Sequence, residues 1–174
     1  DPSASEGRAR NIKMFTEKLQ GNPELYSGVT LNVFDKGRYD LAPRGTADMV
    51  LTFRNLHNWM TGGYDKEALV AIFETLKPGG VFGFVDHRGK ASANVKDLMG
   101  TGYVGQDYII AIAKEVGFEF LGSSELNANS KDTKDHPEGV WTLPPSYRLK
   151  DMDREKYAAI GESDRMTLKF RRPE

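Results

Sequence analysis

The sequence contains no cysteine, which excludes disulfide bonds, thiolate nucleophiles and zinc sites built from thiolates. No hydrophobic run approaches the roughly 18 uninterrupted residues that a membrane-spanning helix needs. Net charge is almost absent as well, at −1, with 24 Lys plus Arg against 25 Asp plus Glu. Such a balance gives no general attraction to nucleic acid. We therefore expect neither a membrane nor a nucleic acid as partner.

What is present is the composition of an ordinary globular domain, with 39% hydrophobic and 28% charged residues. At 174 residues the chain can bury one core, so we predict a single domain over 1–174. Residues 1–6 lack the basic start and the apolar stretch of a signal peptide. Because the chain also opens without Met, we expect a mature, trimmed or incomplete amino terminus. A cysteine-free domain tolerates either redox environment, so the compartment stays open between cytoplasmic and exported.

Helical and strand patterns alternate along the chain. Ser3 and Glu6 stand at capping-box spacing and predict that the first helix begins near Ser3. The alternation is typical of an α/β fold with a largely parallel sheet. Apolar spacing predicts further helices over 65–76 and 109–116, and strands over 29–33, 47–53, 81–85, 118–121 and 166–170.

A polar connection, residues 122–154, follows the predicted strand at 118–121. It is too long for a structureless loop in a compact domain, so we predict a long connection or a lid over a site. Trp141 either pins this connection onto the sheet or lines a substrate pocket beneath it. Tyr103, just before the helix at 109–116, either shapes the same pocket or only helps to turn the chain.

Several motifs resemble those of class I S-adenosylmethionine-dependent methyltransferases. The clearest is Leu-Lys-Pro-Gly-Gly at 76–80 before a buried strand, which resembles the junction between a helix and the fifth strand of that fold. The match is closer still to a group of bacterial predicted methyltransferases, through Asp-His-Arg at 86–88 and Val-Trp-Thr-Leu-Pro-Pro at 140–145. Residues 1–3, 32–35, 47–57, 117–120 and 165–170 resemble the second, third, fourth, sixth and seventh strand regions.

The resemblance implies a Rossmann-like methyltransferase sheet, mostly parallel with an antiparallel last strand, and S-adenosylmethionine as cofactor. Asp1 would hold the cofactor ribose, although a terminal residue can also fray. Asp35 would reach the adenine amine, or simply open a turn. The sequence departs from the family by lacking the first two strands and the glycine-rich turn that approaches the cofactor. The third strand would then pair with the fourth directly, or a partner chain would fill the gap.

The loop after the strand at 47–53 concentrates polar and aromatic residues. In open α/β sheets ligands bind at the carboxyl ends of strands, so this loop is a candidate site. We assign Arg54 and Asn55 to the cofactor and Asn58 and Trp59 to the substrate, along with Tyr103 and Trp141. The alternative is an exposed loop in which an asparagine caps a helix.

Asp86 and His87 lie at the carboxyl end of another predicted strand. Such a pair can supply a general base, because histidine titrates near neutral pH. Neighbouring residues in an extended segment point to opposite faces, so one of the two is expected to be structural. We take His87 as the first candidate for the base and His57 as its rival. No motif with metal-ligand spacing is present, His136 included, so we predict no metal.

The leading hypothesis is methyl transfer to a small-molecule acceptor. The rival is a methyltransferase-like binding or assembly module without catalysis, completed by a partner chain or by a second copy in a homo-oligomer such as a dimer. A hydrolase built on His87 and Asp86 ranks last, because the sequence has neither a Gly-x-Ser-x-Gly elbow nor cysteine.

Overall fold

The computed structural model describes residues 2–91 and 93–174, leaving aside the side chains of 2–5 and 8. Asp1, predicted to hold the cofactor ribose, lies outside the described residues. The chain folds as two compact units, Asp1–Val33 and Phe34–Glu174. The single domain over 1–174 stays a prediction. No helix among the described residues is both long enough and apolar enough to cross a membrane.

The first unit is helical, with α1 (Pro2–Gln20) and α2 (Pro23–Tyr26). The helix predicted from Ser3 is confirmed. The strand predicted over 29–33 is wrong, because these residues adopt no regular structure, and Val29 and Leu31 are 49% and 40% exposed. Alternating apolar residues form a strand only where a neighbouring strand takes up their backbone hydrogen bonds. Within the described residues no strand pairs with 29–33.

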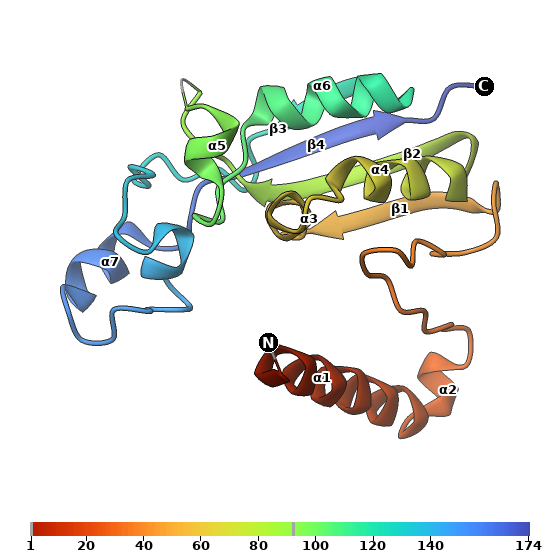
Figure 1. The fold of residues 1–174 in the computed structure, drawn as a ribbon, viewed down its shortest axis with the longest axis horizontal. Coiled ribbons are helices and arrows are strands. Elements are labelled where there is room, and N and C mark those ends of the chain that lie inside the picture. The colour runs from red at the N-terminus through yellow and green to blue at the C-terminus, as the bar shows by residue number, and fades with distance from the viewer. Residues whose placement is uncertain (1, 92) are drawn as a thin grey trace. The chain divides into compact units, whose positions relative to one another are not determined.

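The second unit is built on a four-stranded mixed sheet. Its strands are β1 (Ala47–Phe53), β2 (Leu76–His87), β3 (Glu119–Ser124) and β4 (Arg165–Arg171), in the order β1-β2-β4-β3. β1 and β2 pair in parallel, whereas β4 runs antiparallel to both β2 and β3 (Figure 1). The predicted α/β class with an antiparallel last strand is therefore confirmed.

Helices and turns connect these strands. The carboxyl ends of β1 and β2 point to the end of the sheet beyond which the long connection and α7 fold (Figure 1). The elements are α3 (Leu56–Gly62), α4 (Asp65–Thr75), α5 (Val95–Leu98), α6 (Gln106–Val116), the 3₁₀ turn η1 (Gly139–Thr142) and α7 (Arg154–Ile160).

One face of the sheet carries the hydrophobic core. α4 and α6 lie side by side on this face and bury apolar stripes against it. Phe82 and Phe84 of β2 and Phe170 of β4 are at most 1% exposed. Burying each of these rings stabilises the fold by about 1.5–3 kcal/mol. α6 ends at Gly117, whose φ of 115° lets its N–H reach the carbonyls at the end of the helix.

β2 begins earlier than the sequence predicts. Residues 77–80, which the sequence places before the strand predicted over 81–85, are part of the strand, and Leu76 pairs with Ala47. The N–H of Gly79 donates to the carbonyl of Arg172, and the N–H of Arg172 donates to the carbonyl of Gly80, each at 2.9 Å. Gly79 has a φ of 74°, so a glycine is needed where the chain leaves α4 and joins the sheet.

The other face of the sheet is uncovered along β1 within the second unit. Met49, Leu51 and Phe53 are 56%, 54% and 57% exposed. β1 is also an edge strand, since β2 is its only partner in the described sheet.

Candidate functional site

Three strand ends meet at one edge of the sheet. β1 and β2 end there because they are parallel, and β4 begins there because it is antiparallel to β2. In the β2–β4 register His87 stands opposite Arg165. The loop from Arg54 into α3 brings His57 to the same edge, close to Asp86.

Asp86 and His57 form a hydrogen-bonded pair. The two atoms His57 Nδ1 and Asp86 Oδ1 are 3.0 Å apart, and the backbone N–H of His57 donates to Asp86 Oδ2 over 3.4 Å. The N–H of His87 also donates to Asp86 Oδ1, at 2.8 Å. The Asp86 side chain is fully buried, whereas the His57 side chain is 10% exposed. With Nδ1–H held by a carboxylate, the Nε2 of His57 becomes the proton-accepting atom, as in Ser-His-Asp sites.

His87 has a different environment. Its ring lies 5.4 Å from that of His57, and its Nδ1 shares a hydrogen bond with the Ser163 hydroxyl. Burial lowers the pKa of His87 to about 4; the charge of Asp86 opposes this shift, and nearby positive charges add to it. A base with so low a pKa is neutral near neutral pH but accepts a proton weakly. The geometry therefore favours His57 over His87 as the base.

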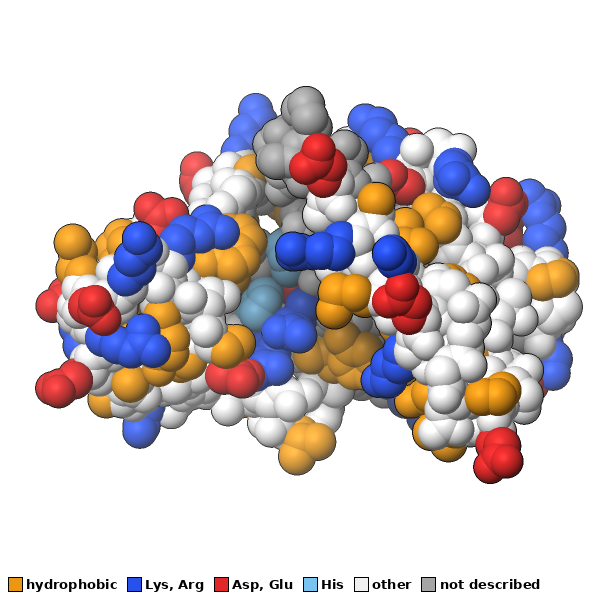
Figure 2. All heavy atoms as spheres, turned by 90° about the horizontal axis from the view of Figure 1, so that it is seen from below, with side chains coloured by type: hydrophobic (Ala, Val, Ile, Leu, Met, Phe, Trp, Pro, Cys, Tyr) orange, Lys and Arg blue, Asp and Glu red, His pale blue; other side chains and the backbone are white. Residues whose placement is uncertain are grey.

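A small cavity of about 90 Å³ opens beside His87. Its walls come from the loop after β1, the end of β2, the start of β4 and the long connection. Figure 2 shows histidine side chains at the surface of the molecule. The lining residues are Arg54, His87, Val140, Trp141, Pro144, Pro145, Ser146, Glu162, Ser163 and Arg165.

Trp141 places the long connection over this site. Its ring meets that of His57 edge to face, with centroids 6.1 Å apart. The guanidinium of Arg148 lies over the Trp141 ring, 4.5 Å from the ring centroid. Trp141 can therefore both hold the long connection against the sheet and line a pocket, because its ring contacts His57 and also lines the cavity.

A buried carboxylate holds the connection in place. Asp132 is 4% exposed and accepts hydrogen bonds from the Tyr103 hydroxyl at 2.8 and 2.9 Å and from the N–H of Asp164 at 2.8 Å. Its oxygen also lies 2.8 Å from Nε2 of His136. Burial, followed by the Asp132 charge, raises the pKa of Tyr103 above its usual range, so Tyr103 stays a hydrogen-bond donor.

Asp164 forms a second anchor beside it. Arg88 binds this carboxylate through two nitrogens, at 3.0 and 2.9 Å, and Lys134 adds an ion pair at 2.7 Å. Burial alone would raise the pKa of Asp164, but the bonds from Arg88 and Lys134 outweigh it and lower the pKa to about 2. Arg88 thereby ties the end of β2 to the segment that enters β4.

The structure places some predicted site residues away from the cavity. Trp59 is 8% exposed in the hydrophobic core, where its ring meets Phe34 at 5.6 Å. Tyr103 is buried against Asp132 and belongs to the anchor of the connection. Asn58 is exposed on α3. The rings of Trp59 and Tyr103 are thus occupied in packing, and their assignment to the substrate stays a prediction.

The two remaining cofactor candidates serve local structure. Asn55 stands at the start of α3, and its side-chain amide donates to the Thr52 hydroxyl at 3.0 Å. Asp35 opens a tight turn in which its backbone and that of Arg38 exchange two hydrogen bonds. Asp35 therefore lies in a turn, as in the alternative interpretation. The strand predicted over 29–33, at whose end Asp35 was expected, is not present.

Ser163 and Arg165 also line the cavity and are not among the site residues predicted from the sequence. A signal was available, because an antiparallel last strand must begin at the edge where β2 ends. Arg165, the first residue of that strand, is then expected beside His87.

His57, Asp86 and His87 each offer a ligand atom, and these atoms lie within 4.8 Å of one another. Ligand atoms this close together could bind a metal ion, although no sequence motif predicts a metal site here. Arg54 and Arg165 both act on His87 with positive charge, however. The positive charges of these two arginines disfavour the binding of a metal cation at the same place. The expectation of no metal stays a prediction.

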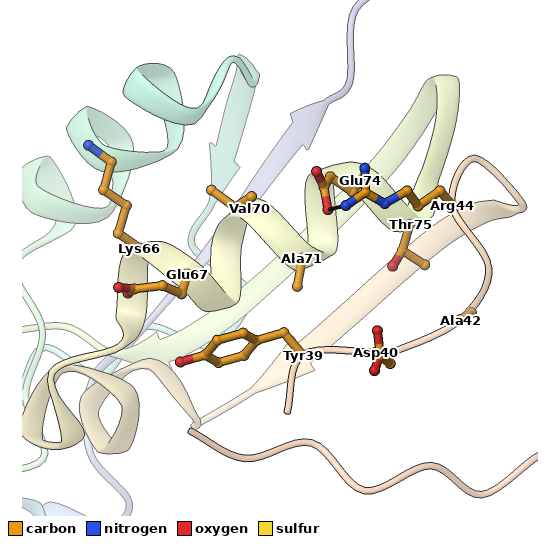
Figure 3. Close-up of a pocket in the computed structure, with 10 residues that line it drawn as sticks. All are labelled: Tyr39, Asp40, Ala42, Arg44, Lys66, Glu67, Val70, Ala71, Glu74 and Thr75. Carbon is orange, nitrogen blue, oxygen red and sulfur yellow. Dashed lines mark ion pairs between the residues drawn. The ribbon is translucent and has the colours of Figure 1, made fainter. Parts of the chain in front are cut away.

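A larger cavity, of about 480 Å³, lies between α4 and the segment that precedes β1. Figure 3 shows Tyr39 and Asp40 on one side and the α4 side chains Lys66, Glu67 and Glu74 on the other. Some of the charged groups that line this cavity pair with each other, as Arg44 does with Glu74 in an ion pair of 3.0 Å. It contains no histidine, so the smaller cavity is the better candidate for chemistry.

Comparison with known proteins identifies the fold. No protein-family model and no curated protein matches the chain. Among solved structures, the [4+2]-cyclase SpnF matches with a TM-score of 0.60 at 19% identity, over 94% of this chain and 62% of SpnF. A Galdieria sulphuraria protein named as a candidate sarcosine dimethylglycine methyltransferase matches at 0.57 and 12%, over 90% of this chain and 64% of its own.

A third match has a defined ligand. The N-methyltransferase NodS of Bradyrhizobium japonicum, solved with S-adenosyl-L-homocysteine, gives a TM-score of 0.50 at 14% identity, over 87% of this chain and 60% of NodS. The chain has a class I methyltransferase fold. It spans about three fifths of the length of these structures. Because one neighbour is a cyclase, this methyltransferase fold by itself does not fix the reaction.

Proposed function

We propose that the chain takes part in methyl transfer from S-adenosylmethionine to a small-molecule acceptor, with His57 as general base. The observation that carries this proposal is the Asp86–His57 pair at the carboxyl edge of a methyltransferase-fold sheet. In open α/β sheets this edge is where ligands bind. The adjoining cavity of about 90 Å³ suits a group on a small molecule better than a polymer chain.

The described residues supply the acceptor side of such a site more fully than the cofactor side. Arg54, at the carboxyl end of β1, is the predicted cofactor residue that faces the cavity. Asn55 is bonded to Thr52, and the glycine-rich turn of the family is not in the printed sequence. The described cofactor candidates therefore do not make up a cofactor site by themselves, and Arg54 can serve the acceptor instead of the cofactor.

The bound cofactor would supply a methyl group made electrophilic by its sulfonium. The residues of this chain would hold and deprotonate the acceptor. Asp86 keeps the His57 ring oriented through Nδ1, so that Nε2 can take the proton of an acceptor hydroxyl or amine. Trp141 covers His57 and keeps water from the reacting group. Alignment of donor and acceptor supplies much of the remaining rate enhancement.

Calorimetric titration with S-adenosylmethionine and S-adenosylhomocysteine tests the cofactor. Isotope-labelled cofactor with a panel of small hydroxyl and amine compounds then tests transfer. We expect His57→Gln and Asp86→Asn to lower the transfer rate by about 10²–10⁴-fold, because the proton acceptor is removed or misoriented. His87→Gln is the matched control, with a loss of less than about tenfold.

Two further readouts separate these roles from misfolding. Circular dichroism and unchanged cofactor affinity must show that the variants are folded. In the pH–rate profile the acidic limb, over which the rate rises with pH as the general base loses its proton, should disappear in His57→Gln and persist in His87→Gln. A chain that binds neither cofactor form, or variants of His57 with the full rate, would contradict the proposal.

The second candidate is a non-catalytic module that a partner chain completes. The exposed apolar residues of β1, Met49, Leu51 and Phe53, on an edge strand favour it. Unpaired sheet edges readily accept another strand. Light scattering tests this reading, because a stable monomer over a range of concentrations would count against completion by a second copy.

A further inference from the structure

Two arginines line the cavity beside His87. Arg54 comes from the loop after β1 and Arg165 from the first position of β4. Arg54 has a φ of 59°, uncommon for a residue with a side chain, and its N–H donates to the carbonyl of Val85 at 2.8 Å. That bond extends the β1–β2 ladder by one residue and fixes Arg54 at the strand end. Unusual backbone geometry of this kind is often retained at functional sites.

The hydrogen-bonding capacity of these arginines is not used up. Within the described part of the chain, the guanidinium of Arg54 has no ion pair or hydrogen bond, and Nε of Arg165 is buried without a partner. Arg165 does pair with Glu162, which also lines the cavity and is 54% exposed. A buried donor without an acceptor costs about 1–3 kcal/mol, so an acceptor from outside the chain would be favoured there.

The charges around the cavity add up to an excess of positive charge. Arg54 and Arg165 contribute two cations, Glu162 contributes one carboxylate, and the low pKa of His87 keeps that ring neutral. Burial, together with the charge of Arg54, lowers the pKa of Arg165, as expected where two guanidinium groups approach each other. Arginine pairs of this kind bind carboxylate and phosphate groups through parallel N–H···O bonds.

We infer that Arg54 and Arg165 form an oxyanion subsite that holds a carboxylate or phosphate group of the acceptor beside His57. The subsite itself stands on the cavity and its unused donors. Its role in acceptor binding rests on the proposed function. The acceptor is then a small molecule with an anionic group, placed so that a neighbouring hydroxyl or amine lies near the imidazole of His57.

Titration of the whole chain with inorganic phosphate and with acetate, followed by NMR, tests the subsite. The chain has three histidines, so the ring signals of His57, His87 and His136 can be assigned by single substitutions. We expect phosphate to shift the signals of His87 and His57 in a saturable way near neutral pH. His136, bonded to Asp132, is the internal control and should not move.

Charge-matched variants sharpen the test. Arg54→Gln and Arg165→Gln should each weaken phosphate binding by about tenfold or more, because a charge-assisted hydrogen bond is lost. Arg154→Gln removes an arginine that stacks on Tyr147 and does not line the cavity; it should change the affinity by less than about twofold. The anion that binds with the lower dissociation constant, acetate or phosphate, would identify whether the subsite prefers carboxylates or phosphates.

Two outcomes overturn the inference: no saturable shift at His87, or equal weakening by Arg154→Gln. The proposed function fails separately. Phosphate binding in a chain that binds no cofactor would leave the subsite standing and remove methyl transfer. Methyl transfer to acceptors without an anionic group, at rates unchanged by Arg54→Gln, would support the proposed function and remove the role of the subsite in acceptor binding.

Discussion

At the scale of single residues, the two histidines of the site differ in what surrounds them. His57 is oriented by a buried carboxylate and keeps some exposure, whereas His87 is buried against Ser163. Chain position cannot distinguish them, since both follow predicted strands. The sequence made His87 the first candidate because it adjoins Asp86. The structure gives that carboxylate to His57 instead, through a contact between residues 29 positions apart.

The low pKa of His87 predicts how stability depends on pH. The unfolded chain protonates this histidine near its ordinary pKa of 6.5, the folded chain only near 4. Between these values the unfolded state binds more protons, so the free energy of unfolding falls as the pH decreases, by up to about 1.4 kcal/mol per pH unit. Below about 4 the effect is complete, and above 6.5 it is absent.

His87→Gln removes this contribution. Urea unfolding of both proteins across the acidic range should show the wild type losing stability relative to the variant between these two pKa values. Parallel curves for the two proteins would show that His87 titrates alike in both states.

At the scale of elements, the long connection was the least predictable part of the chain. Its length and polarity indicate a cover or a lid, and the role of Trp141 in substrate binding stays a prediction. The anchors of this connection could not be predicted from the sequence, because Asp132, Asp164 and Arg88 come together only when the chain folds. Charged residues scattered over a polar stretch look alike until a fold buries some of them. Regular elements such as 47–53 and 109–116 were predictable, since their apolar spacing is local.

Gly139 tests how tightly this connection is seated. Its φ is 56°, and a Cβ added there would lie 2.0 Å from the carbonyl oxygen of Thr101. Backbone cannot yield as a flexible side chain can, so Gly139→Ala should destabilise the fold by about 2–4 kcal/mol in urea unfolding. Gly37→Ala is the control, with a φ of 78° but nothing within 4 Å, and should cost only about 1 kcal/mol. Equal losses would show that the close approach to Thr101 is relaxed in solution.

At the scale of the whole molecule, the sheet is unequally covered. α4 and α6 protect one face, while the edge strand β1 leaves Leu51 and its apolar neighbours exposed on the other face of the second unit. Exposed apolar edges favour association with another strand.

Leu51→Lys places a charge on this edge. If the edge mediates self-association, light scattering should show the variant as a smaller species than the wild type at the same concentration. Leu126→Lys is the control, since Leu126 is 86% exposed on the long connection and lies off the sheet. A wild type that is monomeric, or an equal effect of both variants, would remove β1 as the contact.

From the sequence alone follow the α/β class, the approximate positions of the three longest helices and of the four strands, and the chemistry available at the strand ends. These depend on local periodicity and on residue type, which the chain carries without folding. Folding brings the Asp86–His57 pair together and places the start of β4 beside His87, and it leaves residues 29–33 without a partner strand among the described residues. Such contacts join distant positions, and a strand exists only with a partner, so no local pattern could specify them.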